Sequence, residues 1–223
     1  MVNEIEILKQ NVAEKALSYV QDNSILGIGS GSTVNIFIEY LAKSKIFLNG
    51  VIAASRTSEM LIKEHGYDIL NLNHVDELTY YIDSADEINT NGVMIKGGGA
   101  ALTREKIIAT VAKKFICIVD ESKIKNRIGK RPVPIEVIPM ARSYVARKIV
   151  GLGGNPEYRL GVITDNGNEI LDVYGLDLTD SCKMENEINA ITGVVENGIF
   201  SNRRANTILS ARSNSEVVEI TIK

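Results

Sequence analysis

The hydrophobic positions in the first 120 residues change repeatedly from helical spacing to short apolar runs. A helix is predicted first, because apolar residues recur every three or four positions and Asn3 can cap its start. An apolar strand at residues 24–29 and an amphipathic helix at residues 32–42 follow, joined by the glycine turn GIGSGST. This is the opening strand-helix unit of a parallel sheet. The apolar positions of the first helix are Ile5, Leu8, Val12, Ala16 and Val20.

The same alternation continues as far as Asp120. Strands that alternate with helices predict an α/β fold with a doubly wound, mostly parallel, Rossmann-like sheet. In such a sheet, ligands bind at the carboxyl ends of the strands. The further predicted elements are strands at residues 50–55, 68–72, 79–83 and 115–120, and helices at residues 58–66 and 100–115.

The pattern changes after Lys130, where Pro132, Pro134 and Pro139 lie close together. From there the apolar runs predict the order strand, helix, strand, strand, helix, strand, which is the ferredoxin-like split motif. Two last strands are expected to rejoin the first sheet. The predicted elements are strand 133–138, helix 141–153, strand 157–164, strand 169–175, helix 183–193, strand 194–200 and the closing strands 206–211 and 218–222.

We therefore expect two domains. Residues 1–130 and 203–223 are predicted to form the larger, Rossmann-like domain. Residues 131–202 are predicted to form a smaller α+β domain with the ferredoxin-like (βαββαβ) order, and this domain is a candidate for contacts between subunits.

The amino-acid composition favours a soluble protein and argues against nucleic-acid and membrane binding. The chain has 223 residues, of which 44% are hydrophobic and 24% charged, as in ordinary soluble proteins. A net charge of -3 gives no electrostatic basis for nucleic-acid binding. We expect a cytoplasmic protein without membrane association, because a signal peptide and a long apolar run are both missing. Cys117 and Cys182 suit a reducing compartment, and His65 and His74 have no cysteines at zinc-binding spacing.

The residues with the most chemistry lie in the stretch 80–106. A predicted strand delivers Asp83 and Asp86 to a loop, and after a short apolar return Lys96 precedes three consecutive glycines, Gly97–Gly99. Glycines allow backbone amides to turn towards a bound group. The next segment is helical in composition, so free amides and the helix dipole favour an anion there. We interpret this stretch as an active site.

Glu105 lies in the early turns of that helix. Helical phase places it on the side that carries apolar residues, while Arg104 and Lys106 point sideways. An acid on an apolar stripe is unfavourable unless it is used or paired. The opposite face is also apolar, through Ile107 and Val111, so an ordinary helix position remains an alternative. The apolar neighbours on the side of Glu105 are Ala101, Leu102, Ile108 and Ala112.

The segment GIGSGST, residues 27–33, suits a phosphate monoester, because it offers amides, hydroxyls and the positive end of a helix dipole. An ordinary turn is the alternative. The segment is not a Walker loop, because the final Gly-Lys is absent. It is a poor dinucleotide fingerprint, because Ser32 stands where a third glycine is required. Arg56, after the second strand, keeps an NADP-linked oxidoreductase as an alternative.

The two acids also have other interpretations. Asp83 and Asp86 are compatible with a helix cap, a turn, or half of a magnesium site that includes Glu87. A magnesium site needs further oxygen ligands, and Lys96 would compete for the carboxylates. We therefore expect no metal at this site.

A phosphate cradle, two acids, a candidate base and a lysine suit proton transfer next to a carbonyl. Isomerisation of an aldose phosphate to a ketose phosphate fits: one carboxylate moves a proton between adjacent carbons, while Lys96 and glycine amides stabilise the enediolate oxygen. Lys123 follows a strand end, where a phosphate partner would lie, and Lys9 is at the edge of the first helix's stripe. For both lysines a solvated position is the alternative, and a non-catalytic sugar-phosphate sensor is a third hypothesis for the chain.

Five segments resemble type A ribose-5-phosphate isomerase and occur in that family's order: GIGSGST, YIDSADEI, IKGGGAALTREKIIATVAKKFICIVDESK, PVPIEVIPMAR and VITDNGNEILDV. The resemblance covers nearly the whole chain. It implies interconversion of D-ribose 5-phosphate and D-ribulose 5-phosphate in the non-oxidative pentose phosphate pathway, without metal or cofactor, in a homodimer or homotetramer. Arg204 and Asn206 stand where Gly and Asp are usual, which bears on a local loop and subunit contacts rather than on the reaction.

The resemblance also implies roles for single residues. Glu105 is implied to be the general base. Asp83, Asp86 and Lys96 are implied to act in ring opening and on the sugar hydroxyls or the enediolate. The residues implied to bind the substrate are Ser30, Gly31, Ser32, Thr33, Ser84, Ala85, Gly97, Gly98, Gly99, Lys123 and Lys9.

Overall fold

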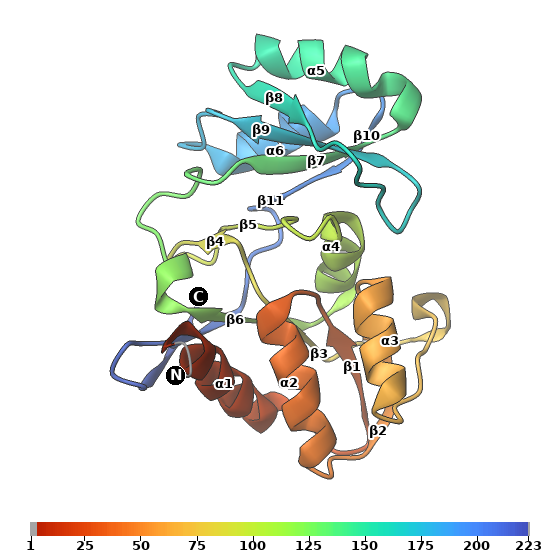
Figure 1. Ribbon diagram of the computed structural model, residues 1–223, viewed down its shortest axis with the longest axis vertical. Coiled ribbons are helices and arrows are strands. Elements are labelled where there is room, and N and C mark those ends of the chain that lie inside the picture. The colour runs from red at the N-terminus through yellow and green to blue at the C-terminus, as the bar shows by residue number, and fades with distance from the viewer. Residues whose placement is uncertain (1–3, 223) are drawn as a thin grey trace.

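The structure, a computed structural model, describes residues 4–222, so the expected cap Asn3 lies outside the described residues. Its largest element is a six-stranded sheet in the order β13-β12-β6-β3-β1-β2 (Figure 1). Neighbouring strands are parallel except β12 and β13, which are antiparallel. The predicted mostly parallel sheet and its two closing strands are confirmed. The strands are β1 Ser24–Ile28, β2 Leu48–Ala53, β3 Tyr80–Asp83, β6 Lys114–Asp120, β12 Thr207–Ala211 and β13 Val217–Thr221.

Helices cover both faces of this sheet. Three helices, α1 (Glu4–Ala16), α2 (Ser32–Lys43) and α3 (Arg56–Glu64), pack into the core on one face. The fourth, α4 (Leu102–Val111), packs into the core on the other face. This arrangement is the doubly wound fold that the sequence predicts. No helix within residues 4–222 is long and apolar enough to cross a membrane.

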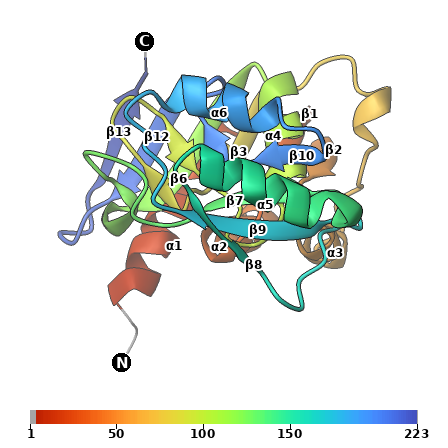
Figure 2. The same cartoon turned by 90° about the horizontal axis from the view of Figure 1, so that it is seen from above.

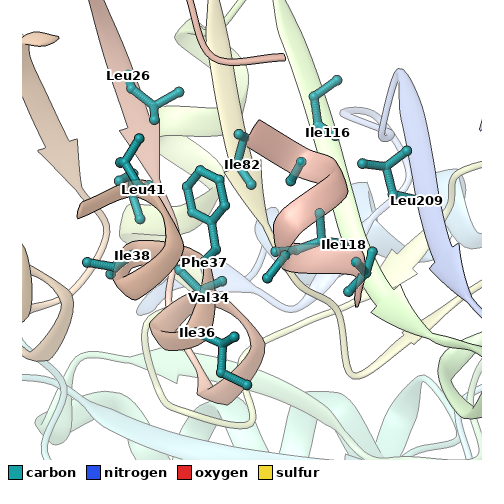
Figure 3. Packing of buried hydrophobic residues seen from close by; sticks show 14 of the residues in the cluster. Leu26, Val34, Ile36, Phe37, Ile38, Leu41, Ile82, Ile116, Ile118 and Leu209 are labelled. Carbon is teal, nitrogen blue, oxygen red and sulfur yellow. The ribbon is translucent and has the colours of Figure 1, made fainter. Parts of the chain in front are cut away.

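Successive strand residues supply two cores on opposite faces of the sheet. Figure 3 shows Phe37 of α2 next to Ile82 of β3 in the first core. The neighbouring residue, Tyr81, belongs to the second core with Ile108 of α4, and its ring centroid lies 4.9 Å from that of Phe115. Strand periodicity therefore directs Tyr81 and Asp83 towards the face that α4 covers.

Residues 68–72 do not form the predicted strand. Val51 and Ile69 share only an isolated parallel bridge, and a short 3-10 helix, Leu72–His74, follows. The side chain of Asn71 caps that turn by accepting a backbone hydrogen bond. The polar residues at the end of this segment favour turn hydrogen bonds over a strand ladder.

The second layer is a four-stranded sheet in the order β10-β7-β9-β8, in which every neighbouring pair is antiparallel (Figures 1 and 2). Two helices cover one face, and the chain order is the predicted βαββαβ motif. We call this layer the small unit. Its elements are β7 Val133–Val137, α5 Arg142–Gly151, β8 Asn155–Tyr158, β9 Glu169–Tyr174, α6 Ser181–Asn189 and β10 Val194–Asn197.

Two predicted strands of the small unit have different bounds. The strand expected at residues 157–164 ends at Tyr158, and residues 159–168 form a loop that reaches towards α3 and α4 (Figure 1). Gly161, at φ +76°, adopts a left-handed conformation that a strand does not allow. The strand expected at residues 194–200 is interrupted at Gly198.

That interruption creates a third, three-stranded sheet between the two layers. It consists of β4 (Glu87–Ile88), β5 (Met94–Ile95) and β11 (Ile199–Phe200). A Cβ atom on Gly198 would lie 2.2 Å from the carbonyl oxygen of Lys96, so the close approach of these strands requires glycine. The division of the chain at residues 131 and 203 into two domains stays a prediction.

Candidate active site

Two neighbouring parallel strands, β1 and β3, end side by side and bring two loops together. Gly29 follows β1, and Asp83 is the last residue of β3. A Cβ atom on Gly29 would lie 1.9 Å from Cγ of Asp83, so this approach requires glycine. The segments GIGSGST and YIDSADEI, which are distant in the sequence, therefore meet at the carboxyl ends of the strands.

Asp83 is fully buried, and donor groups surround its carboxylate. Oδ1 accepts hydrogen bonds from the backbone N–H groups of Ser30 at 3.1 Å and Ser84 at 2.7 Å. Oδ2 lies 2.8 Å from Nζ of Lys96 and accepts a hydrogen bond from the hydroxyl of Tyr81. These donors compensate for burial of the carboxylate and fix its orientation.

Lys96 links the carboxylates of the site. Its Nζ donates to the carbonyl oxygen of Ser84 at 2.5 Å and lies 3.3 Å from Oε2 of Glu105. Burial lowers the pKa of Lys96, but the charges of Asp83 and Glu105 outweigh burial and raise this pKa above its ordinary value. Lys96 therefore stays protonated and supplies a positive charge inside the site.

Glu105 is 3% exposed and faces inward from α4, as helical phase predicts. Its Oε1 accepts a hydrogen bond from Oγ of Ser30 at 2.7 Å, whereas its Oε2 accepts none from any residue in the described part of the chain. Burial raises the pKa of Glu105 to about 7, although the charge of Lys96 opposes the shift. A carboxyl group with this pKa can both accept and release a proton near neutral pH.

A cavity of about 330 Å³, which we call the first cavity, opens beside the buried acids. The first turn of α2 lines it, so amides and a positive helix end face the space. The lysines on either side add positive charge. The sequence-predicted residues that line the first cavity are Lys9, Gly31, Ser32, Thr33, Ser84, Ala85, Asp86 and Lys123.

The three glycines form a turn at the edge of the site. Gly97 has φ +105°, and its carbonyl oxygen accepts a hydrogen bond from N–H of Ala100 at 2.9 Å. The N–H of Gly98 donates to Oδ2 of Asp86 at 2.8 Å. One of the amides that the sequence suggests for ligand binding is thus already bound within the protein.

The N–H of Gly99 has a different environment. It meets no acceptor among residues 4–222. Gly99 lines a second cavity, of about 300 Å³, together with Ser30 and Gly31. Ser30 donates to Glu105, and Gly31 lines both cavities, so the two cavities adjoin the same loop.

Sequence reasoning missed Tyr81 and Arg131. Tyr81 is fully buried and donates to Asp83, two residues ahead on the same strand face, and this spacing was an available signal. Burial, followed by the nearby charge of Asp83, raises the pKa of the Tyr81 hydroxyl well above its ordinary value, so the hydroxyl stays a donor. Arg131 lines the first cavity, but no local pattern points to it.

The alternative interpretations receive less support. Glu87, suggested as a magnesium ligand with the two aspartates, accepts backbone hydrogen bonds from Gly129, Lys130 and Arg131 instead. Within residues 4–222 no group of three His, Cys, Asp or Glu side chains is placed to hold a metal ion. The N–H of Arg56 donates to Asp165 at 2.8 Å, and its Nε lies 3.8 Å from the same carboxylate, so the arginine that suggests an NADP phosphate faces an acid instead.

Comparison with known proteins gives consistent results. The family model for Ribose 5-phosphate isomerase A (phosphoriboisomerase A) matches residues 50–215. The chain is 54% identical over 213 residues to ribose-5-phosphate isomerase A of Dichelobacter nodosus, covering 96% of this chain and 98% of that protein. It is 53% identical over 204 residues to ribose-5-phosphate isomerase A of Legionella pneumophila (strain Lens), covering 92% and 94%.

Two solved structures are also similar to this chain. The crystal structure of ribose 5 phosphate isomerase A from Neisseria gonorrhoeae is 44% identical, covers 100% of this chain and 99% of that chain, and has a TM-score of 0.96. A D-ribose-5-phosphate isomerase in complex with phospho-erythronic acid is 37% identical, covers 97% of this chain and 99% of that chain, and has a TM-score of 0.92.

Proposed function

The chain belongs to the ribose 5-phosphate isomerase A family, and on this premise we propose that it interconverts D-ribose 5-phosphate and D-ribulose 5-phosphate with Glu105 as the general base. The main support for this mechanism is the environment of the Glu105 carboxyl group. It is buried, one of its oxygens accepts no hydrogen bond within the described chain, and burial raises its pKa to about 7. Glu105 takes the proton from C2 of the open-chain aldose and returns it to C1.

Negative charge develops on the substrate oxygens as the enediolate forms. The ammonium of Lys96, held by Asp83, and the free N–H of Gly99 stabilise that charge. Both donors are fixed before the substrate binds, so little reorganisation is needed during the reaction. The geometry of the donors around Lys96 and in the glycine turn supports this assignment.

The two aspartates have different roles in this proposal. Asp83 is surrounded by donors and orients Lys96. Asp86 lines the first cavity and accepts one hydrogen bond, from Gly98, so it contacts the sugar hydroxyls and assists ring opening. The phosphate binds in the first cavity at the start of α2, between Lys9 and Lys123.

A coupled assay with ribose 5-phosphate tests the proposed function. We expect ribulose 5-phosphate to form at the same rate with and without EDTA, because the acids and Lys96 supply the proton transfer and the charge stabilisation. Binding of ribose 5-phosphate without turnover would indicate a sensor instead. Turnover that requires NADP would indicate an oxidoreductase.

The proposal includes a homodimer or homotetramer in the cytoplasm. Side chains around the start of α5 are apolar and exposed, with Met140 at 96%, Ile138 at 43% and Tyr144 at 41%. Such a group of apolar side chains favours contact with another subunit. Light scattering after size exclusion is expected to give a dimer or tetramer mass, and a monomer at micromolar concentration would contradict this part. The unpaired Cys117 and Cys182 suit a reducing compartment.

A further inference from the structure

Arg159 of the small unit contacts the glycine turn directly. Its Nη1 donates to the carbonyl oxygens of Gly97 and Gly98, each at 3.1 Å. The rest of the guanidinium binds Asp172 on β9, with Nε at 2.8 Å from Oδ2 and Nη2 donating to Oδ1. Arg159 therefore joins a carboxylate of the small unit to the backbone of the turn that borders the catalytic groups.

The geometry of the peptide bond makes this contact important for catalysis. In a trans peptide the C=O and the following N–H point in opposite directions, and the described chain contains no cis peptide. A donor that holds the carbonyls of Gly97 and Gly98 therefore turns the N–H groups of Gly98 and Gly99 away from the small unit. The N–H of Gly98 then reaches Asp86, and that of Gly99 is left without an acceptor in the described chain.

We infer that Arg159 is a positioning residue for the isomerisation: by binding the two carbonyls, it aims the Gly99 N–H at the developing enediolate oxygen and Gly98 at Asp86. This inference rests on the proposed function. Arg159 touches no reacting atom in this scheme. The guanidinium also draws electron density from the peptide groups that it binds, which makes their N–H groups stronger donors.

An arginine is required at this position. Its planar group has enough donors to bind a carboxylate through one edge and two carbonyls through another nitrogen. Lysine carries a single ammonium on a flexible stem and cannot hold both partners in one plane. Arg159→Lys is therefore expected to behave more like a deletion than like a conservative change.

Arg142 provides a matched control. It is also an arginine of the small unit whose Nη1 binds a carboxylate on β9, Glu169, at 3.1 Å and 3.2 Å. It stacks on Tyr158 and, within residues 4–222, forms no hydrogen bond with the glycine turn. Arg142→Met thus removes a comparable ion pair of the same sheet and leaves the turn in place.

The experiment compares Arg159→Met, Arg159→Lys and Arg142→Met in steady-state kinetics and in inhibition by phospho-erythronic acid, whose carboxylate carries two oxygens and a negative charge like the enediolate. We expect both Arg159 variants to lose roughly 10- to 100-fold in kcat, somewhat less than the loss of a whole oxyanion donor. The KM is expected to change little, because the aimed amide acts mainly in the transition state. The inhibition constant of phospho-erythronic acid is expected to rise at least tenfold, and Arg142→Met is expected to change neither quantity.

Several outcomes would overturn the inference. One is a normal kcat in Arg159→Met, and another is an equal rise of KM and of the inhibition constant, which would indicate general loosening of the site. Chemical denaturation of each variant separates folding from function, and Asp172→Asn, which keeps the arginine but weakens its anchor, is expected to show a smaller loss in the same direction. If the unmodified chain shows no isomerase activity, the proposed function itself fails, and this result is distinct from all of these.

Discussion

Two buried lysines, Lys96 and Lys106, each lie between two carboxylates, and both ammonium groups face the ring of Phe200, at 5.8 Å and 4.8 Å. Lys96 meets Asp83 and Glu105 at the candidate active site. Lys106 meets two acids of the small unit, from α6 and β10. The same combination of charges is thus used twice within a short stretch of chain.

The two clusters differ in how completely their acids are hydrogen-bonded. Lys106 donates to Glu185 and Glu196 at 2.9 Å each and to the carbonyl oxygen of Ile199 at 2.7 Å. The other oxygen of Glu185 accepts two backbone N–H groups, those of Ser201 and Asn202. In the Lys96 cluster, Oε2 of Glu105 accepts no hydrogen bond from the described chain.

On the proposed mechanism, this difference distinguishes the structural Lys106 cluster from the reactive Lys96 cluster. Glu185 accepts hydrogen bonds at both carboxylate oxygens, and its ion pair with Lys106 joins two layers of the fold. Glu105 is buried and has a raised pKa, and within residues 4–222 its Oε2 has only the ion-pair contact with Lys96 at 3.3 Å, so this oxygen keeps a place for a proton. The positive charge of a neighbouring lysine is common to both, so the lysine alone does not identify the base.

The largest expected effect is the loss of the base. Glu105→Gln keeps the shape of the side chain but cannot accept a proton, so kcat is expected to fall by about 10²- to 10⁴-fold, with binding of ribose 5-phosphate retained. The corresponding change in the other cluster, Glu185→Gln, is expected to retain most of the turnover at a temperature where it is folded. Single-turnover assays and calorimetric titration measure the two effects. Normal turnover in Glu105→Gln would remove the distinction between the clusters.

The second effect concerns stability. Lys106→Met leaves the buried Glu185 and the half-buried Glu196 without their cation, and loss of one partner from a buried ion pair costs about 3–5 kcal/mol. Denaturant unfolding of this variant is expected to show such a loss. Lys113→Met is the matched control, since its partner Glu77 is exposed and such pairs contribute about 0–1 kcal/mol. Equal stability of the two variants would show that the Lys106 cluster does not join the layers.

How far the sequence could predict these clusters depends on the range of the interactions. The inward position of Glu105 follows from helical phase, which is local, and the structure confirms it. The same reasoning places Lys106 at the side of the helix but predicts no partner for it: Lys106 is 7% exposed, because Glu185 and Glu196 bind it. Those acids lie 79 and 90 positions further along the chain, so no local pattern could show the pairing.

The glycine turn likewise combines a feature set by local sequence with one set by distant residues. Its position at the edge of the site was predictable from GGG before a helix. Which amide stays free was not predictable, because it depends on Asp86 from one side and Arg159 from the other. Arg159 itself lay inside a segment predicted as a strand, and a strand would have directed its side chain by alternation alone.

The third prediction uses pH. Because burial raises the pKa of Glu105 to about 7, kcat/KM is expected to fall about tenfold per pH unit well below pH 7, as the base becomes protonated. The free energy of unfolding depends on pH in the opposite direction. The folded chain binds a proton at Glu105 that the unfolded chain has released, so stability decreases as pH rises from about 4.5 to 7, by on the order of 3 kcal/mol from this group. Glu105→Gln is expected to lack this contribution in denaturant unfolding at pH 5 and pH 8, whereas an unchanged pH dependence would contradict the raised pKa.

The smallest expected effect tests the single hydrogen bond that Glu105 accepts. Oγ of Ser30 donates to Oε1 at 2.7 Å and thereby stabilises the ionised form, so Ser30→Ala is expected to raise the pKa of Glu105 further. A neutral donor to a charged acceptor contributes about 1.5–3 kcal/mol, so the fall of kcat/KM at low pH should move up by roughly one to two pH units at most, with less change at pH 9.

Asn189→Ala is the equivalent change in the other cluster, since Asn189 donates to Oε1 of Glu196 at 2.7 Å. It removes one of several donors from an acid that has no part in the proposed proton transfer, so it is expected to lower stability slightly and to leave the pH profile unchanged. If both variants shifted the fall of kcat/KM at low pH, this fall would reflect the general charge balance of the protein and not the protonation of Glu105. A shift in Ser30→Ala alone would assign the fall to Glu105, because Ser30 donates to Glu105 and not to the acids of the Lys106 cluster.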